Sequence, residues 1–288
     1  MKKYTNIFFV AFIILVSVCA CRPEPKETPT KGYLKCLVDE SLFNVIKEER
    51  DTFVGLYKNT KVDLSAMKAR EGIAAVLNGE AKIFISSRNL NNEEKDFLDK
   101  TKPEIKIFKF CYDGVALIVN EFESLDKITI EELKNILSGG KSSIQVFMPE
   151  RNSGVYEYVK SEILNDEDPK NITILKSEKE IIDKIRNSRN MIGIVGLNMI
   201  SNEKNIKAMH VSIGEKNIVG DNYYEPIPGY LVNGSYPLVR TCYILINEIG
   251  VYVASGFASF LTSTEGQKIV LKNNLGPATV PVKLKQLY

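Results

Sequence analysis

Short apolar runs alternate with amphipathic stretches along most of the chain. Residues 34–38 (LKCLV), 61–65 (KVDLS) and 82–87 (KIFISS) have the length and apolar character of short buried strands. Between them, residues 39–59 and 70–80 carry apolar side chains at roughly helical spacing. This repeated strand–helix–strand order predicts an α/β protein, with a mainly parallel sheet flanked by helices.

The second half of the chain repeats this style. Its pattern predicts strands over 143–148 and 191–197 and helices over 128–137, 153–164, 178–188 and 251–274. Several helix starts are marked by a residue type that caps helices. The candidate caps are Asp39 or Ser41, Asn91 or Asn92, Thr129 and Ser153. Asn78-Gly79 is typical of a helix end.

Two extended segments are too long for ordinary single strands. Residues 105–120 contain Asp113-Gly114 in their middle, and residues 236–247 form the second segment. Residues 105–120 are either two strands or one strand that crosses between lobes, and residues 236–247 can provide a second crossing. We therefore expect a two-lobed protein, with residues 32–113 plus 238–288 in the first lobe and 114–237 in the second.

The N-terminus has the pattern of an export signal, residues 1–20. Lys2 and Lys3 precede an uncharged apolar run, Ile7 to Val18, whose twelve residues reach about 18 Å as a helix, short of a ~30 Å bilayer core. The run ends in VCAC, which resembles a bacterial lipoprotein signal with Cys21 as the acylated residue. Cys19 is a weaker rival, and an ordinary secretory signal cut near Ala20 is the alternative.

Residues 21–31 hold three prolines among charged and polar residues, and such a segment is typical of an extended tether. Three cysteines follow it, Cys36, Cys111 and Cys242, each in an apolar strand-like run. Their odd number argues against a complete disulfide framework, so we expect buried free thiols.

Composition narrows the classes of function. Hydrophobic residues make up 44% and charged residues 26% of the chain, as in a globular protein. The 38 basic residues against 36 acidic ones become a neutral balance once Lys2 and Lys3 are removed, which gives no electrostatic footprint for nucleic acid. A single histidine, His210, excludes multi-histidine metal sites, and we expect neither a metal nor another cofactor.

Two short segments suggest an anion site. RNSGVYEYV places Arg151, Ser153 and Gly154 at a helix start, where free N–H groups and the helix dipole favour an anion. ISSRNL places Ser87 and Arg88 at the carboxyl end of a strand, where ligands bind in open α/β sheets. Each alone has a plainer interpretation, a cap for Ser153 and a surface ion pair for Arg88. Together, on opposite lobes, they predict a ligand site in a cleft.

Two catalytic interpretations are weaker. GGKSS (139–143) lacks the earlier glycine of a phosphate-binding P-loop and follows a helix instead of a strand. A hydrolase that uses Ser153 would need a base, and His210 is the only histidine available. We expect a binding protein and not an enzyme.

The order of the segments resembles the phosphate-binding lipoproteins of bacterial ABC importers. KIFISSRNLNNEE, DGVALIVN, ITIEELKNILSGG, RNSGVYEYV, MIGIVGLNMIS and the C-terminal segments are similar to successive parts of that family. The resemblance implies the two-lobed type II periplasmic binding protein fold and capture of inorganic phosphate for an ABC permease. It also implies a lipid-anchored location in the bacterial cell envelope. The same fold could instead bind another anion or small metabolite, or act as a sensor.

The resemblance assigns ligand contacts to Ser153, Gly154 and Val155, with Arg151 nearby and Ser87 and Arg88 across the cleft. The family has a threonine where this chain has Val155, and its first anion loop is replaced by Asp39-Glu40-Ser41. That loop follows the first strand, so it should face the cleft. Phosphate still carries a proton at neutral pH, which Asp39 or Glu40 could accept while Ser41 donates. Sulfate has no such proton, so these carboxylates predict its exclusion.

Overall fold

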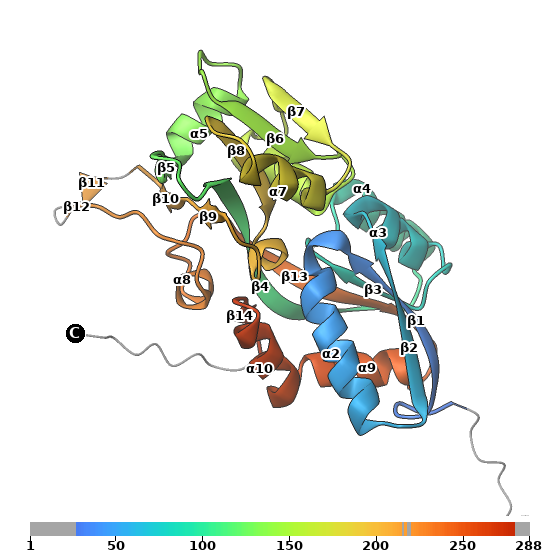
Figure 1. The fold of residues 1–288 in the computed structure, drawn as a ribbon. Coiled ribbons are helices and arrows are strands. Elements are labelled where there is room, and N and C mark those ends of the chain that lie inside the picture. The colour runs from blue at the N-terminus through green and yellow to red at the C-terminus, as the bar shows by residue number, and fades with distance from the viewer. Residues whose placement is uncertain (1–26, 215, 218–219, 280–288) are drawn as a thin grey trace, which may run out of the picture.

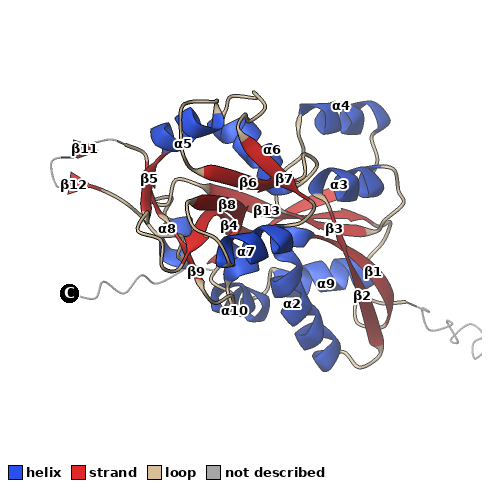
Figure 2. Ribbon diagram, turned by 45° about the horizontal axis from the view of Figure 1, so that its top comes forward, coloured by secondary structure: helices blue, strands red, loops and turns tan. Residues whose placement is uncertain are grey.

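A large mixed sheet runs through the protein, and helices cover both of its faces (Figure 1, Figure 2). The computed structural model describes residues 27–214, 216–217 and 220–279. The main path of the sheet is formed by eight strands: β2 (Thr60–Met67), β1 (Gly32–Asp39), β3 (Ile83–Ser86), β13 (Val239–Asn247), β4 (Ile105–Asn120), β8 (Met191–Gly196), β6 (Gln145–Pro149) and β7 (Ile172–Leu175), in this order. Two short strands, β9 (Ile206–Ala208) and β14 (Gly276–Pro277), also pair with β4.

The helical elements lie between these strands as the strand–helix alternation predicts. The first lobe carries η1 (Glu40–Leu42), α2 (Phe43–Leu56), α3 (Ala69–Leu77), α4 (Asn92–Thr101), α9 (Val253–Leu261) and α10 (Thr264–Lys272). The second carries α5 (Ile130–Leu137), α6 (Gly154–Tyr158), the π-helical turn η2 (Val159–Ile163), α7 (Glu178–Arg186), η3 (Leu197–Ile200) and α8 (Pro228–Val232). Two small sheets complete the second lobe, β5 (Lys127–Thr129) with β10 (His210–Ser212) and β11 (Lys216–Asn217) with β12 (Gly220–Asp221).

Strand directions differ between the outside and the centre of the sheet. The outer strands are parallel as predicted, since β1 pairs in parallel with β2 and β3, and β6 with β7 and β8. The central strands β4 and β13 run antiparallel to each other and to their neighbours. β4 runs from one lobe into the other, as expected of a crossing segment, and β13 enters the first lobe from its start at Val239. The local sequence pattern did not predict that these two strands run in opposite directions.

Hydrophobic packing separates into two regions along β4. One buried cluster is drawn from residues 115–238, and the others come from residues 34–111 and 242–275. The division falls beside Gly114, opposite Val239 in the β4–β13 register. The sheet therefore carries two lobes, seen at the top and the bottom of Figure 1, joined through its two central strands.

Several helices begin at the capping side chains that the sequence predicts. Asn91 and Thr129 each form a capping box with the glutamate three residues later, and the Ser153 hydroxyl accepts from the Tyr156 N–H. The single helix predicted over 251–274 is wrong, because the structure has two helices there. α9 ends at Leu261, and the Ser263 side chain caps α10 by accepting from the Gly266 N–H.

The expected signal peptide and Cys21 lie outside the described residues. Within the described ranges, no helix has both the length and the apolar character needed to span a bilayer. Cys36, Cys111 and Cys242 are buried, as predicted, and no disulfide joins them to one another.

Candidate functional site

The two lobes meet at a buried cluster of polar side chains, which we call the interlobe cluster. It comprises Asp39, Ser41, Ser87, Asp113, Ser153, Glu178 and Arg240, all at most 4% exposed, with Gly154 and Gly196 between them. The members come from the carboxyl ends of β1, β3 and β8, the starts of α6 and α7, and the crossing strands β4 and β13. Buried polar groups require partners, so their hydrogen bonds show how the cluster is organised.

Asp39 gathers donors within the first lobe. Its Oδ1 accepts from the Ser41 N–H at 3.0 Å, which caps η1, and its Oδ2 accepts from the Ser87 hydroxyl at 2.7 Å. Asp39 therefore fixes the loop after β1 against the end of β3. The capping role considered for Asp39 is confirmed, and its second oxygen reaches a residue 48 positions away.

Glu178 joins the lobes. It is the first residue of α7, and its Oε1 accepts from the Ser41 hydroxyl at 2.6 Å. Its Oε2 accepts from the Gly196 N–H, also at 2.6 Å. Burial raises the pKa of Glu178 to about 7, although the positive charge of Arg240 acts in the opposite direction.

Arg240 supplies the positive charge of the cluster. Its register partner on the neighbouring crossing strand is Asp113, whose Oδ2 accepts from Nε at 3.0 Å and from Nη2 at 2.6 Å. Among the described residues, no group accepts a hydrogen bond from the buried Nη1 of Arg240. This nitrogen is therefore a cationic donor available to an anionic ligand.

Two glycines allow the lobes to approach this closely. A Cβ on Gly154 would lie 1.9 Å from the Ser87 Oγ, 3.2 Å from the Asp39 Oδ2 and 3.3 Å from the Arg240 Nη1. A Cβ on Gly196 would lie 2.7 Å from the Arg240 Nη2. Any side chain at these positions would push the lobes apart, so glycine is required by the close approach.

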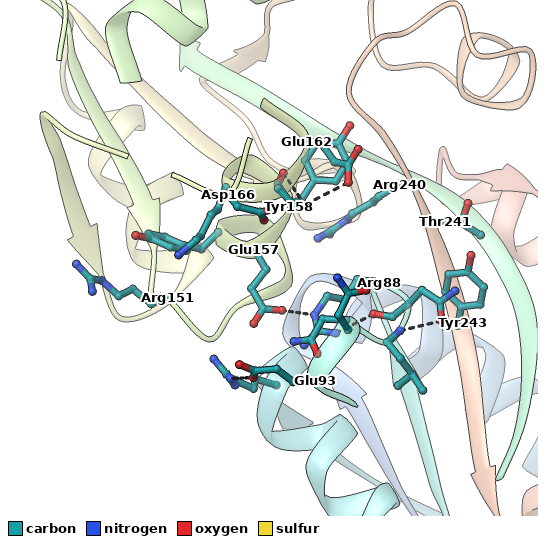
Figure 3. Close-up of a pocket in the computed structure, with 18 of the residues that line it drawn as sticks. Arg88, Glu93, Arg151, Glu157, Tyr158, Glu162, Asp166, Arg240, Thr241 and Tyr243 are labelled. Atoms are coloured by element: carbon teal, nitrogen blue, oxygen red, sulfur yellow. Dashed lines mark hydrogen bonds and ion pairs between the residues drawn. The ribbon is translucent and has the colours of Figure 1, made fainter. Parts of the chain in front are cut away.

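A cleft of about 890 Å³ opens beside the interlobe cluster (Figure 3). Arg240 belongs both to this cleft and to the cluster. The other walls come from α4, α6, η2 and β13, and they include Arg88, Tyr158, Thr241 and Tyr243. The cleft carries charged side chains of both signs, so shape and local pairing must decide what enters it.

Arg88 lies on the wall of this cleft, and its guanidinium is engaged by carboxylates. Nη1 and Nη2 donate to the two oxygens of Glu94 at 2.7 and 2.8 Å. Glu157 of α6 reaches across from the second lobe and forms an ion pair with Nε (Figure 3). Arg88 therefore holds the lobes together, and none of these bonds reaches the interlobe cluster.

The other residues predicted from the sequence lie outside the interlobe cluster. Arg151 is exposed and lies on the cleft wall, while Val155 is fully buried in the core of the second lobe. The Glu40 side chain binds Lys68 at 2.5 Å, and Lys68 also donates to the Lys176 carbonyl of the second lobe at 2.8 Å. The structure thus brings Asp39, Ser41, Ser87, Ser153 and Gly154 together, and it does not bring Glu40, Arg88 or Arg151 into that group.

Sequence reasoning missed Asp113, Glu178 and Arg240. Arg240 is the sole charge in the run YPLVRTCYILIN, and Asp113 stands in the other long apolar segment. A charge inside such a run is a signal for a buried partner. Glu178 offered no signal, because the exposed Glu180 stands two residues later in the same helix start.

The described residues offer little for metal or serine chemistry. No group of three or more His, Cys, Asp or Glu side chains in the described ranges could hold a metal ion. His210 belongs to the small β5–β10 sheet, apart from the elements that form the interlobe cluster. Ser153 uses its oxygen as a helix cap, so the Ser153–His210 pair gains no geometric support.

Comparison with known sequences gives relatives of similar length. The phosphate-binding protein PstS of Staphylococcus saprophyticus is 24% identical, and the match covers 98% of this chain and 92% of that protein. PstS of a bovine Staphylococcus aureus strain is also 24% identical, over 82% of this chain and 76% of that protein.

Solved structures share the fold. A protein ascribed to a phosphate ABC transporter of Clostridium perfringens, solved with bound phosphate, matches 86% of this chain and 100% of its own. Its TM-score is 0.74 at 22% identity. An ABC-type phosphate transport receptor from Vibrio cholerae matches with a TM-score of 0.64 at 20% identity, over 84% of this chain and 99% of its own.

A family model described as a PBP superfamily domain matches residues 23–265, which is most of the chain. The match includes every element of the interlobe cluster and both crossing strands. The α/β fold predicted from the alternation of strands and helices is the fold of these relatives. The chain therefore belongs to the PBP superfamily.

Proposed function

We propose that this protein captures inorganic phosphate at the interlobe cluster and delivers it to an ABC importer, without catalysing a reaction. The observation that carries this proposal is the buried Nη1 of Arg240, which has no acceptor among the described residues. It lies against Gly154, beside the Ser87 hydroxyl. The names of the PstS relatives support the choice of ligand.

The groups of the cluster match a partly protonated phosphate. Arg240 provides a charge-assisted donor, and Gly154 and Ser87 lie next to it. Asp39 is a buried acceptor that could receive the P–OH proton. Sulfate would leave that acceptor unpaired and add repulsion, so we expect the site to reject it.

Delivery depends on tethering and on movement of the lobes. We infer that acylated Cys21 anchors the protein at the surface of the bacterial cell envelope and that a tether follows it within residues 21–31. The end of that range is not extended, because residues 28–31 form a turn closed by Thr28 and Lys31 and packed beside Gly256. Residues 32–113 plus 238–288 and residues 114–237 are the proposed mobile units, with hinges in β4 and β13. The separation of the buried clusters at these strands supports that division.

Isothermal titration with phosphate and sulfate tests the proposal. We expect phosphate to bind and sulfate to fail. Ser87→Ala should weaken phosphate binding about 10-fold or more, because the Ser87 hydroxyl holds Asp39, the proposed acceptor of the P–OH proton, in place. Ser86→Ala is the matched control, because the Ser86 hydroxyl donates to the Arg88 carbonyl and lies outside the cluster.

Equal phosphate affinity in wild type and Ser87→Ala would place the site elsewhere. Failure of the wild type to bind either anion would overturn phosphate as the ligand. It would favour a ligand with hydroxyl or cationic groups, because the cluster holds three carboxylates and one guanidinium.

A further inference from the structure

The Ser41 hydroxyl lies between the two lobes with its proton already committed. It donates to the Glu178 Oε1 at 2.6 Å, and a serine hydroxyl has one proton to give. While Glu178 is ionised, the Ser41 oxygen can offer a further ligand only its lone pairs. Lone pairs repel an anionic oxygen, so this arrangement opposes anion binding.

The second oxygen of Glu178 determines where a proton could be added. Oε2 accepts from the Gly196 N–H at 2.6 Å, and a backbone N–H can only donate. A proton on Oε2 would find no acceptor in the Gly196 N–H, whereas a proton on Oε1 faces the Ser41 oxygen, so Oε1 is the favoured place for it. Glu178 would then donate to the Ser41 oxygen, and the Ser41 proton would be released to point at a ligand.

We propose that Glu178 is a positioning residue that couples anion binding to the uptake of one proton, because its protonation changes Ser41 from an acceptor into a donor. One proton passes from solvent to the Glu178 Oε1, the Ser41 O–H turns from Glu178 to the anion, and no other bond forms or breaks. This inference rests on the proposed function and concerns the same site.

Charges of both signs surround Glu178. Arg240 of β13 faces it and stabilises the ionised form, whereas Glu40 of η1 acts against that form. Lys68 pairs with Glu40, and the negative charges of Asp113 and Asp39 also act on Arg240. Of the elements that pack against α7, β6, β7, β8 and η3 carry no charged residue. β4 contributes Asp113, and Lys207 of β9 donates to the Glu123 carbonyl.

An arriving anion adds negative charge where three carboxylates already face one guanidinium, so neutralising one carboxylate relieves the repulsion. Glu178 is the member suited to this change. Its side chain is fully buried, and burial raises its pKa to about 7, within reach of ordinary pH.

Titration calorimetry with phosphate can count the protons. Wild type, Glu178→Gln and the control Glu180→Gln are compared from about pH 6 to about pH 9, in pairs of buffers with different ionisation enthalpies. Phosphate itself titrates in this range, so the difference between variants is the readout. Glutamine fits the site, because its oxygen can accept from Gly196 and its amide can donate to Ser41.

We expect wild type and Glu180→Gln to take up more protons per phosphate above neutral pH than Glu178→Gln. Relative to Glu178→Gln, wild-type affinity should fall about tenfold for each pH unit above the pKa of Glu178. Ser41→Ala should diminish the proton uptake of the wild type, since the hydroxyl no longer contributes to the coupling. This variant also covers the case in which Glu178→Gln does not fold.

Identical proton counts and pH profiles in wild type and Glu178→Gln, with phosphate bound by both, would overturn this inference and leave the proposed function standing. Undiminished proton uptake in Ser41→Ala would overturn the route through the hydroxyl. Absence of phosphate binding by wild type at every pH would overturn the proposed function, and this inference with it.

Discussion

At the scale of single residues, the most exceptional group outside the site is Glu49. It lies on the buried face of α2 with an exposure of 0%, and no described residue forms a hydrogen bond with either carboxylate oxygen. Burial raises its pKa to about 9, so the carboxyl is neutral in the folded protein at neutral pH. The unfolded chain ionises near the ordinary value of 4.5, which makes folding pH-dependent.

Glu49→Gln should change the pH dependence of stability. The folded pKa is raised, so the contribution of Glu49 is complete below about pH 4.5 and is lost as pH rises towards about 9, at about 1.4 kcal/mol per pH unit. Thermal unfolding across this range should show the melting temperature of Glu49→Gln rising relative to that of the wild type as pH increases. A constant difference between the two melting temperatures would contradict this.

Glu48→Gln is a contrasting control one residue away. Glu48 is paired with Lys272, and this hydrogen bond lowers its pKa. Its contribution is therefore present at neutral pH and is lost on acidification. The difference between this variant and wild type should shrink towards acid pH, opposite to the pattern expected for Glu49→Gln.

The sequence predicted the local members of the site and missed those defined by distant pairing. Ser153 and Gly154 were found because a helix start has its own signature, and Ser87 because it follows a strand. Arg240 meets Asp113 across 127 positions, and Ser41 meets Glu178 across 137. Spacing along a chain carries no information about such contacts until the strand order is known.

At the scale of elements, an ion-pair network joins α6 of the second lobe to α4 of the first through Arg88. Glu157 on α6 pairs with Arg88, which is held in place by Glu94 of α4. The side chains are 12–18% exposed, so solvent weakens this interaction only in part. A contact of this kind stabilises the closed arrangement of the lobes.

Glu157→Gln should shift the ligand-free protein towards a more open form. Arg88 keeps Glu94 as its partner, so the first lobe retains its fold while about 1 kcal/mol of interlobe attraction is lost. Small-angle scattering should show a larger radius of gyration without phosphate and recovery of the compact form with it. Glu93→Gln removes an exposed ion pair with Arg70 inside the first lobe, and it should leave the radius unchanged.

At the scale of the whole molecule, the alternation of apolar runs was enough to predict the fold class and an extended segment over 105–120. The sequence left open whether that segment is one strand or two, and the structure shows one. The antiparallel centre of the sheet and the break between α9 and α10 were not predicted. Strand direction depends on how distant segments pair. The break at Ser263 depends on its hydroxyl, which caps the start of α10.

Attachment to the membrane is also a property of the whole protein. We expect Cys21 to carry lipid, because it follows a short apolar run and precedes a proline-rich segment. Intact mass of membrane-extracted protein should show the added acyl groups, and Cys21→Ser should appear in the soluble fraction. Equal lipidation and membrane retention of Cys21→Ser would contradict the assignment, and Cys19→Ser is the matched comparison.

The place of β13 in the sheet has a consequence for the order in which the chain folds. β13 is inserted between β3 and β4, although its residues 239–247 follow the entire second lobe in sequence. Until it arrives, β3 and β4 each present an unpaired edge, which is a template for aggregation. Residues 114–237 are contiguous, so the second lobe can fold early. The first lobe cannot be completed until β13 pairs with β3, which requires closing a long loop. The second lobe should therefore fold before the first. A chain truncated before β13 should contain a folded second lobe and an incomplete first-lobe sheet that is prone to aggregate.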